Sequence, residues 1–282
     1  MTNIRALTSI DAAVALARQL GLAVDTARVL HVGNNVTVHL PPAPVVAKVC
    51  TSPVPHARSR HATELELAEH LVSRGVPVVP VSRVLAPGPH ACGPCAATFL
   101  EFVDGEPAHS LAPDVAGPLL RDLHTAMAEY HGPTELDLWT RALDAAGAML
   151  ADPAALGRLD ASDRALLHRL YVELRGEIER STVRLCPIHG DARAGNLLQS
   201  PAGPLWMDFE AVCLGPAEWD LASMPEGTEA WLPDVNAALL ASLRRLRQVC
   251  LVISCWNQYE RTREIACAAE LHLGLLKDSV QG

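Results

Sequence analysis

The sequence lacks any apolar run close to the roughly 20 residues that a membrane-spanning helix requires. Its first twenty residues alternate polar and apolar types, without the charged start and apolar centre of a secretory signal. The sequence also contains no internal repeat and no low-complexity tract. We therefore expect a cytoplasmic, globular protein with no membrane partner.

Positive charge is scarce, because 23 Lys and Arg residues stand against 32 Asp and Glu residues, for a net charge of -9 at pH 7. Nucleic acids are bound by clustered basic side chains, and the sequence has no such cluster. We therefore expect no nucleic-acid partner. The acidic balance favours a cationic small molecule as ligand.

The dense cysteine spacing of a secreted disulfide scaffold is lacking too, since the eight cysteines are scattered over 282 residues. Only Cys92 and Cys95 form a two-residue spacing around Gly-Pro. A thioredoxin-like motif would open a helix, whereas this pair runs into a strand-like segment. A zinc site that included His90 would need a second pair of ligands. We interpret the pair as flanking a turn between two strands.

The composition that remains is typical of a folded chain, with 49% apolar and 20% charged residues, and the length suffices for two modest lobes. Residues 29–40 and 45–50 predict a three-stranded meander. Residues 56–74 predict a helix that Gly75 ends, so one helix is expected in the first hundred residues. Residues 78–85 and 96–103 predict two further strands.

Beyond Gly105 the pattern becomes mostly helical. Helices are predicted over residues 118–130, 136–150, 162–180 and 233–276, the last of them broken. We place the boundary near Val103. The N-terminal lobe would then comprise residues 1–103 and the C-terminal lobe residues 104–282.

The segment 185–221 differs from the helices around it, because it combines short apolar runs, turns and unusual polar residues. Leu197–Leu198 and Leu205–Met207 flank a turn rich in Pro and Gly, so we expect them to pair as a hairpin. This pairing would bring Asp208 close to Asn196, with Asp191 just upstream. Converging amide and carboxylate oxygens are the ligands that magnesium prefers.

Kinase chemistry needs three groups of this kind. One aspartate accepts or orients the proton of the acceptor hydroxyl, an asparagine a few residues later binds metal, and a second aspartate carries magnesium on the nucleotide phosphates. Asp191, Asn196 and Asp208 fit these roles in order. His189–Asp191 and Asp208–Glu210 also resemble the signature motifs of the aminoglycoside phosphotransferase and choline kinase group.

That resemblance covers about residues 32–222 and implies an α+β, protein-kinase-like bilobal fold. Such a fold has a small N-terminal antiparallel sheet with one helix and a mostly helical C-terminal lobe. The resemblance also implies a phosphotransferase that uses ATP or GTP with Mg²⁺ and an alcohol group as acceptor. A protein kinase is disfavoured because Phe209 is followed by Glu210 instead of glycine, and no Ala-Pro-Glu motif comes later.

Three residues around the base receive further roles. Arg193 is a catalytic candidate that stands where the family more often has histidine; it would neutralise charge on the transferring phosphate or pair with a nearby carboxylate. The resemblance implies that His189 organises the catalytic loop and that Asp220 supports it. Asp220 also suits the N-terminus of a helix, where the helix dipole favours a carboxylate.

Lys48 is the candidate for nucleotide phosphates, because it is one of only two lysines, with Lys277, and lies in a β-branched run. An ammonium in a buried strand can act there as a point charge, which is the role of the third-strand lysine of kinases. It needs a buried carboxylate partner. Glu64 shares a helical stripe with Leu67 and Leu71, so we predict that it pairs with Lys48.

Two further segments are candidates for cofactor binding. Gly33 and Asn34 lie in a turn that could place backbone amides against phosphate, and the same residues also suit a plain hairpin turn. Glu101 and Val103 lie in an extended segment at the lobe junction, which the resemblance identifies as the adenine-binding hinge.

The acceptor stays open between two classes. An aminoglycoside or similar cationic antibiotic is favoured, which would make the protein a resistance enzyme, and a metabolic kinase for choline, homoserine or a sugar is the alternative. A pseudokinase without turnover is disfavoured because the catalytic residues are all present. For the oligomeric state we expect either a monomer or a homodimer. The resemblance implies an acceptor site on the C-terminal helices. Candidate lining residues, each of which also suits a solvated helix face, are Glu226, Glu229, Asp234, Trp256, Tyr259, Glu260, Glu264 and Glu270.

Overall fold

The computed structural model describes residues 2–33, 35–50, 57–92, 95–132, 135–152, 154–258 and 263–281. The chain divides into two compact units. The first comprises Met1–Leu111, Leu119–Glu135 and Arg193–Val212, and the second comprises Ala112–Pro118, Leu136–Ala192 and Cys213–Gly282. Among the described helices, none has the length and apolar character needed to cross a bilayer.

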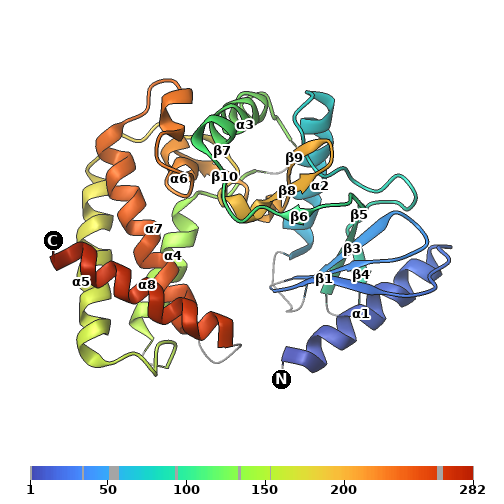
Figure 1. Cartoon of the computed structure of the whole chain (residues 1–282), viewed down its shortest axis with the longest axis horizontal. Helices are drawn as coiled ribbons and strands as arrows, with labels where there is room; N and C mark the ends of the chain where they lie inside the picture. Colours follow the sequence, from blue (N-terminus) through green and yellow to red (C-terminus); the bar gives the residue numbers. More distant parts are fainter. Residues whose placement is uncertain are drawn as a thin grey trace. The chain divides into compact units, whose positions relative to one another are not determined.

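The first unit contains an antiparallel sheet (Figure 1). The sheet has five strands in the order β1-β2-β3-β5-β4. Its strands are β1 (Arg28–Val32), β2 (Asn35–His39), β3 (Val45–Cys50), β4 (His90–Cys92) and β5 (Cys95–Glu101). The predicted meander is therefore confirmed. All six residues of β3 are buried, because a β-branched strand in the middle of a sheet can be covered on both faces.

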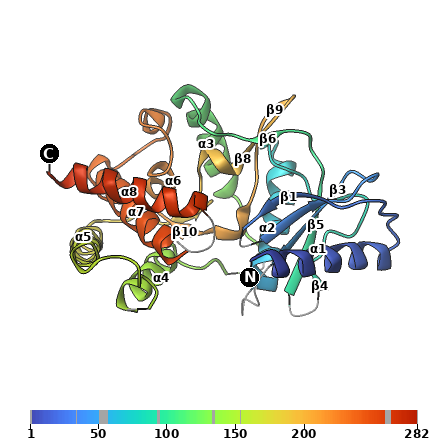
Figure 2. The same cartoon turned by 60° about the horizontal axis from the view of Figure 1, so that its bottom comes forward.

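Two helices accompany this sheet, α1 (Thr2–Gln19) and α2 (Ala57–Ser73). Helix α1 lies along one face of the sheet, where Ala13 and Ala17 are fully buried against strands β2 and β3 (Figure 2). The expectation of a single helix in the first hundred residues was wrong. The buried face of α1 is built partly from alanine, which contrasts too weakly with the polar face to reveal the helical period.

The strand predicted over residues 78–85 is absent as a continuous element. Only isolated bridges form there, from Val78 to Trp206 and from Val81 to Leu100. Pro77 and Pro80 lack an N–H group, so this segment cannot build a full ladder.

The β4–β5 hairpin agrees with the interpretation of the cysteine pair. Cys92 lies opposite Cys95 in the register, and both are free thiols whose pKa values are raised by burial. A protonated, buried thiol is a poor redox nucleophile. Gly93 and Pro94, the residues of the proposed turn, lie outside the described residues.

A second, three-stranded sheet in this unit holds the predicted hairpin. Strands β8 (Leu197–Ser200) and β9 (Gly203–Trp206) pair antiparallel, and β6 (Glu106–Pro107) joins the free side of β8. Single 3-10 turns precede and follow the hairpin at Ala194–Asn196 (η1) and Phe209–Ala211 (η2). The hairpin prediction is confirmed, and Asn196 and Asp208 lie at the open end of the pair.

The second unit is mainly helical. Its helices are α4 (Thr140–Ala151), α5 (Ala161–Glu179), α6 (Ala217–Leu221), α7 (Ala237–Asn257) and α8 (Arg263–Gln281), with a 3-10 turn η3 (Thr228–Trp231). Leu143, Leu167, Leu174 and Leu243 belong to their common core. Strands β7 (Cys186–Ile188) and β10 (Cys213–Gly215) pair antiparallel beside it. The break predicted within residues 233–276 is confirmed between α7 and α8.

Helix α3 (Pro113–Met127) contributes to both units. It begins five residues before the predicted start at Pro118, which therefore lies inside the helix. Proline favours the first helical turn, and that preference misplaced the predicted start.

Candidate active site

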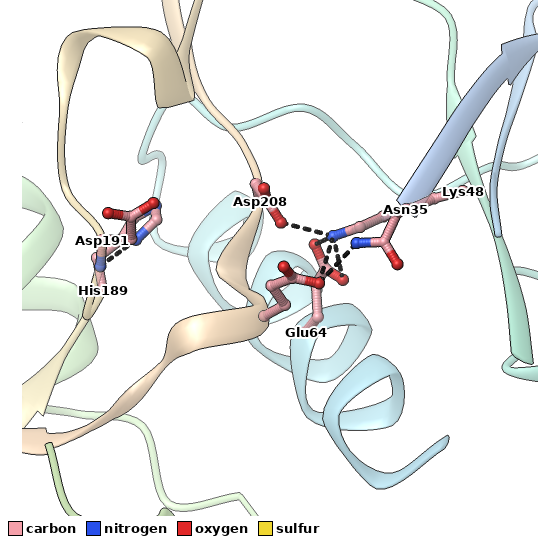
Figure 3. Close-up of polar contacts among 7 residues, drawn as sticks. Asn35, Lys48, Glu64, His189, Asp191 and Asp208 are labelled. Atoms are coloured by element: carbon pink, nitrogen blue, oxygen red, sulfur yellow. Dashed lines mark hydrogen bonds and ion pairs between the residues drawn. The ribbon is translucent and has the colours of Figure 1, made fainter. Parts of the chain in front are cut away.

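Lys48 is buried and lies at the centre of a partly buried ionic cluster in the first unit (Figure 3). Its Nζ donates to both carboxylate oxygens of Glu64, at 2.8 and 2.9 Å, and to Oδ1 of Asp208 at 2.7 Å. Oε2 of Glu210 is 3.8 Å from the same nitrogen. The predicted pairing of Lys48 with Glu64 is present, and the cluster joins strand β3, helix α2 and the end of the β8–β9 hairpin.

Alternation along β3 explains why Lys48 reaches α2. Val45, Ala47 and Val49 pack with the side chains of α1, so Lys48 points to the opposite face of the sheet. Burial by itself lowers the pKa of Lys48, but the surrounding carboxylates outweigh this effect and raise it. The ammonium is therefore held charged, which a phosphate contact requires.

Asp208 owes its position to an unusual backbone conformation. It adopts the left-handed region at φ 65°, two residues beyond the end of strand β9, and its side chain binds Lys48. The N–H of Met207 donates to the carbonyl of Asn196 at 3.0 Å, so the two predicted metal ligands stand on neighbouring backbone.

The donor set fits a hard cation. Asn196 and Asp208 offer an amide oxygen and a carboxylate, whereas no group of three or more His, Cys, Asp or Glu side chains within the described ranges could hold a metal by itself. Magnesium commonly takes one or two protein ligands and completes its shell with phosphate oxygens and water. These residues therefore suit magnesium that arrives with a nucleotide.

Two polar residues in this cluster were not predicted. Asn35 donates from Nδ2 to Oε2 of Glu210 at 2.7 Å, which joins the start of β2 to the segment after Asp208. His61 lies one turn before Glu64 on α2, is 2% exposed, and its Nδ1 has no partner among the described residues. Burial and the charge of Lys48 lower the pKa of His61 to about 4, although Asp208 opposes them. His61 could have been identified from the sequence, because it lies on the same helical stripe as Glu64.

Asp191 lies in the second unit, on a loop that is fixed through its backbone. The buried carboxylate of Asp220 accepts from the N–H groups of His189 and Gly190, each at 2.9 Å. Nδ1 of His189 accepts from the N–H of Asp191 at 3.3 Å (Figure 3). The predicted structural roles of Asp220 and His189 agree with these contacts.

Arg247 on helix α7 is a third residue that was not predicted from the sequence. Its Nη2 donates to Oδ1 of Asp191 at 3.1 Å, and its guanidinium carbon lies 4.3 Å from the ring centroid of Trp219. Arg247 follows Leu243 by four residues, which places a charged side chain on the buried stripe of α7. That departure from the apolar pattern could have drawn attention to it.

The structure describes four of the five remaining candidates for cofactor binding or catalysis. Gly33 donates its N–H to the carbonyl of Asn35 at 2.9 Å in the β1–β2 turn, and Asn34 lies outside the described residues. The N–H of Glu101 donates to Pro80, whereas that of Val103 has no protein acceptor among the described residues. Arg193 is exposed in the first unit, next to the η1 turn.

The candidate acceptor residues are mostly solvent-exposed where they are described. Glu226, Asp234, Glu264 and Glu270 are exposed. Glu229 binds Arg244 at 2.9 Å, and Trp256 packs against the helical core. Tyr259 and Glu260 lie outside the described residues.

Comparison with solved structures gives the same fold at low identity. An amicoumacin kinase, hAmiN, in complex with AMP-PNP, Ca²⁺ and Ami matches with a TM-score of 0.72 and 12% identity, over 99% of this chain and 96% of that chain. The GDP complex of aminoglycoside 2'-phosphotransferase-IIIa matches with a TM-score of 0.70 and 14% identity, over 96% and 99%. A microcompartment-associated aminopropanol kinase matches with a TM-score of 0.66 and 22% identity, over 93% and 94%.

Comparison at the level of sequence agrees with the motifs. None of the curated proteins matches the chain significantly. The model of the phosphotransferase enzyme family matches residues 12–252, which is most of the chain and includes both the Lys48 cluster and the Asp191 loop. The protein therefore belongs to the phosphotransferase enzyme family, as a kinase-like enzyme that transfers a phosphoryl group to an alcohol acceptor.

Proposed function

We propose that this protein moves the γ-phosphoryl group of ATP or GTP to a hydroxyl of a small molecule, with Asp191 as catalytic base. The observation that carries the proposal is the position of Lys48, which bridges Glu64 and Asp208 at 2.8 and 2.7 Å. A strand lysine held between a helix glutamate and a hairpin aspartate is the arrangement that kinases use to orient phosphates.

In this proposal the first 103 residues hold the nucleotide. Lys48 contacts the phosphates, and Glu64 keeps its ammonium in place. Gly33 and Asn34 would offer backbone amides to the phosphates, while the carbonyl of Glu101 and the N–H of Val103 would bind the base. Val103 supports this role, because its N–H has no protein acceptor among the described residues, whereas the N–H groups of Glu101 and Phe102 bind Pro80 and Pro44.

Residues 104–282 supply the catalytic groups. Asn196 and Asp208 would hold Mg²⁺, which neutralises charge on the phosphate oxygens and orients them. Asp191 accepts the hydroxyl proton as the acceptor oxygen attacks phosphorus and the bond to the nucleotide breaks. Arg193 is proposed to offset charge on the transferring group. The chemistry fits a cytoplasmic location, where nucleotide and magnesium are supplied.

We propose a cationic antibiotic as the leading acceptor, with resistance as the outcome. An amicoumacin kinase and an aminoglycoside phosphotransferase share the fold over nearly the whole chain, and the net charge of -9 favours a cationic ligand. The alternative is a metabolic kinase, which the 22% identity to an aminopropanol kinase supports.

An acceptor panel tests these proposals. Purified protein, Mg²⁺ and γ-labelled ATP or GTP would be incubated with aminoglycosides, peptide antibiotics, choline, aminopropanol, homoserine and sugars, and phosphate transfer would be measured. Transfer to an antibiotic, with protection of a susceptible bacterium that expresses the protein, supports the leading proposal. Efficient transfer only to a metabolite, without protection, replaces it with the alternative.

A further inference from the structure

The backbone of the loop that carries Asp191 is held by helix α6, and the same helix is tied to α7. Besides the bonds to Asp220, the carbonyl of Gly190 accepts from Nε1 of Trp219 at 2.9 Å. The neighbouring Glu218 accepts from the N–H of Asn236, the N-cap of α7, at 2.8 Å. Consecutive residues of α6 therefore fix both the loop and the start of α7.

Arg247 bridges these parts from the middle of α7. Its Nη1 donates to the Gly190 carbonyl at 3.4 Å, its Nη2 donates to Asp191, and its guanidinium stacks on Trp219. The Arg247 side chain is 16% exposed, compared with 37% for Asp191. Arginine is suited to this geometry, because its planar group can stack on an aromatic ring and donate along its edge at the same time.

We infer that Arg247 is a positioning residue, which holds the Asp191 carboxylate in the orientation needed to accept the proton of the acceptor. The inference rests on the proposed role of Asp191 as base. A charge-assisted bond from a guanidinium that is itself stacked on Trp219 restrains the two side-chain torsions of the aspartate. A base displaced by about 1 Å can cost on the order of 100-fold in rate.

This role predicts a selective kinetic defect. Arg247→Met should lower kcat roughly 10- to 100-fold and leave the KM for nucleotide within about twofold, because Lys48 and Asp208 are untouched. Arg247→Lys should recover only part of the loss. An ammonium cannot stack on an aromatic ring and at the same time donate two hydrogen bonds with the fixed geometry of a guanidinium. Arg175→Met is the matched control. Arg175 is also partly buried and paired with Asp144 and Glu179, but it does not contact the 189–191 loop.

A double-mutant cycle distinguishes positioning from structural support. Single-turnover transfer from γ-labelled ATP and GTP would be measured for wild type, Arg247→Met, Asp191→Asn and the double variant. The acceptors would be kanamycin, aminopropanol and water, and unfolding temperatures would be recorded in parallel. If Arg247 acts through the Asp191 carboxylate, Arg247→Met should cost less than about threefold in the Asp191→Asn background.

The outcomes separate the inference from the function on which it rests. Equal losses in both backgrounds, or a loss that follows a lowered unfolding temperature, would show that Arg247 only supports the fold and would overturn the inference. Full activity of Arg247→Met would overturn it as well. Full activity of Asp191→Asn would instead remove the base assignment itself.

Discussion

Lys48 shows how single residues set the electrostatics of the proposed nucleotide site. One ammonium faces Glu64, Asp208 and Glu210, so the cluster carries an excess of negative charge until cations accompany a nucleotide. Removing one partner from a buried ion pair leaves the charge of the other partner uncompensated. The resulting loss of stability is larger than the net stabilisation that the intact pair provides.

Lys48→Ala should therefore raise the KM for nucleotide and lower kcat, and Glu64→Gln should produce a milder form of the same defect. Because the two side chains are in direct contact, the double variant should deviate from additivity by about 0.5 to 3 kcal/mol in transition-state free energy. Glu66→Gln is the matched control, since Glu66 lies on the same helix but binds Tyr130. Additive effects of Lys48→Ala and Glu64→Gln would argue against the ion pair.

The buried imidazole of His61 should make stability depend on pH. Its pKa is lowered to about 4 by burial and Lys48, whereas the unfolded chain has the ordinary value of 6.5. Between these values the unfolded state binds more protons, so the free energy of unfolding should fall as pH decreases from about 6.5 toward 4, by up to about 3 kcal/mol.

Comparison of variants isolates this contribution. His61→Phe should flatten the pH dependence of the unfolding free energy over that window, as measured by urea titration at each pH. His168→Phe, at an exposed position of α5, should retain the wild-type slope. An unchanged slope in His61→Phe would assign the pH dependence to other groups.

At the level of elements, the β6–β8 pairing holds the β8–β9 hairpin against the segment that follows the proposed hinge. Gly105 approaches this hairpin closely, because a Cβ built at Gly105 would lie 2.4 Å from the backbone oxygen of Gln199, at a φ of 157°. A side chain there must displace backbone, and overpacking of this kind costs about 1 to 3 kcal/mol.

Gly105→Ala should lower the free energy of unfolding by about that amount and reduce kcat, because β8 leads back to Asn196. Gly274→Ala is the control, since a Cβ at Gly274 on helix α8 would meet no atom within 4 Å. Alanine should stabilise that helix by up to about 1 kcal/mol. Chemical denaturation of the two variants measures both effects, and a neutral Gly105→Ala would show that the hairpin tolerates displacement.

At the scale of the whole molecule, nucleotide binding should stabilise the fold by mass action. Ligand at about 100 times its Kd adds about 2.7 kcal/mol, which a thermal shift assay detects. Asp208→Ala should abolish the part of the shift that depends on magnesium, whereas Asp191→Ala should keep the shift and lose turnover by roughly 10² to 10⁴ fold. A magnesium-dependent shift that persists in Asp208→Ala would reassign the metal site.

The net charge of the molecule supplies a test of the acceptor. If exposed carboxylates attract a polycationic drug, its KM should rise with ionic strength, because salt screens charges over about 8 to 10 Å. A neutral or zwitterionic metabolite should show little change. Initial rates across a range of KCl concentrations, with the KM for nucleotide as reference, measure the effect, and a flat response to an aminoglycoside would argue against acidic recognition.

The sequence by itself determined what local pattern encodes. The β-branched run around Lys48, the turn between β8 and β9 and the stripe that carries Glu64 follow from spacing alone, and the motif order identified the family. Helix α1 was not predicted because its buried Ala13 and Ala17 differ little in hydrophobicity from the polar face of the helix. The predicted strand at residues 78–85 was wrong because its prolines lack the N–H groups that a continuous ladder of hydrogen bonds requires.

Only the tertiary structure decided which distant side chains meet. Asn35 and Glu210 are 175 residues apart in sequence, and Arg247 and Asp191 are 56 apart. Neither pairing can be recognised from the spacing of residues in the sequence. A contact between separate elements depends on how whole helices and strands pack, and not on the residues beside each partner. The backbone conformation of Asp208, a non-glycine residue at positive φ, is likewise maintained by the surrounding structure. A non-glycine residue outside a folded structure rarely adopts that conformation.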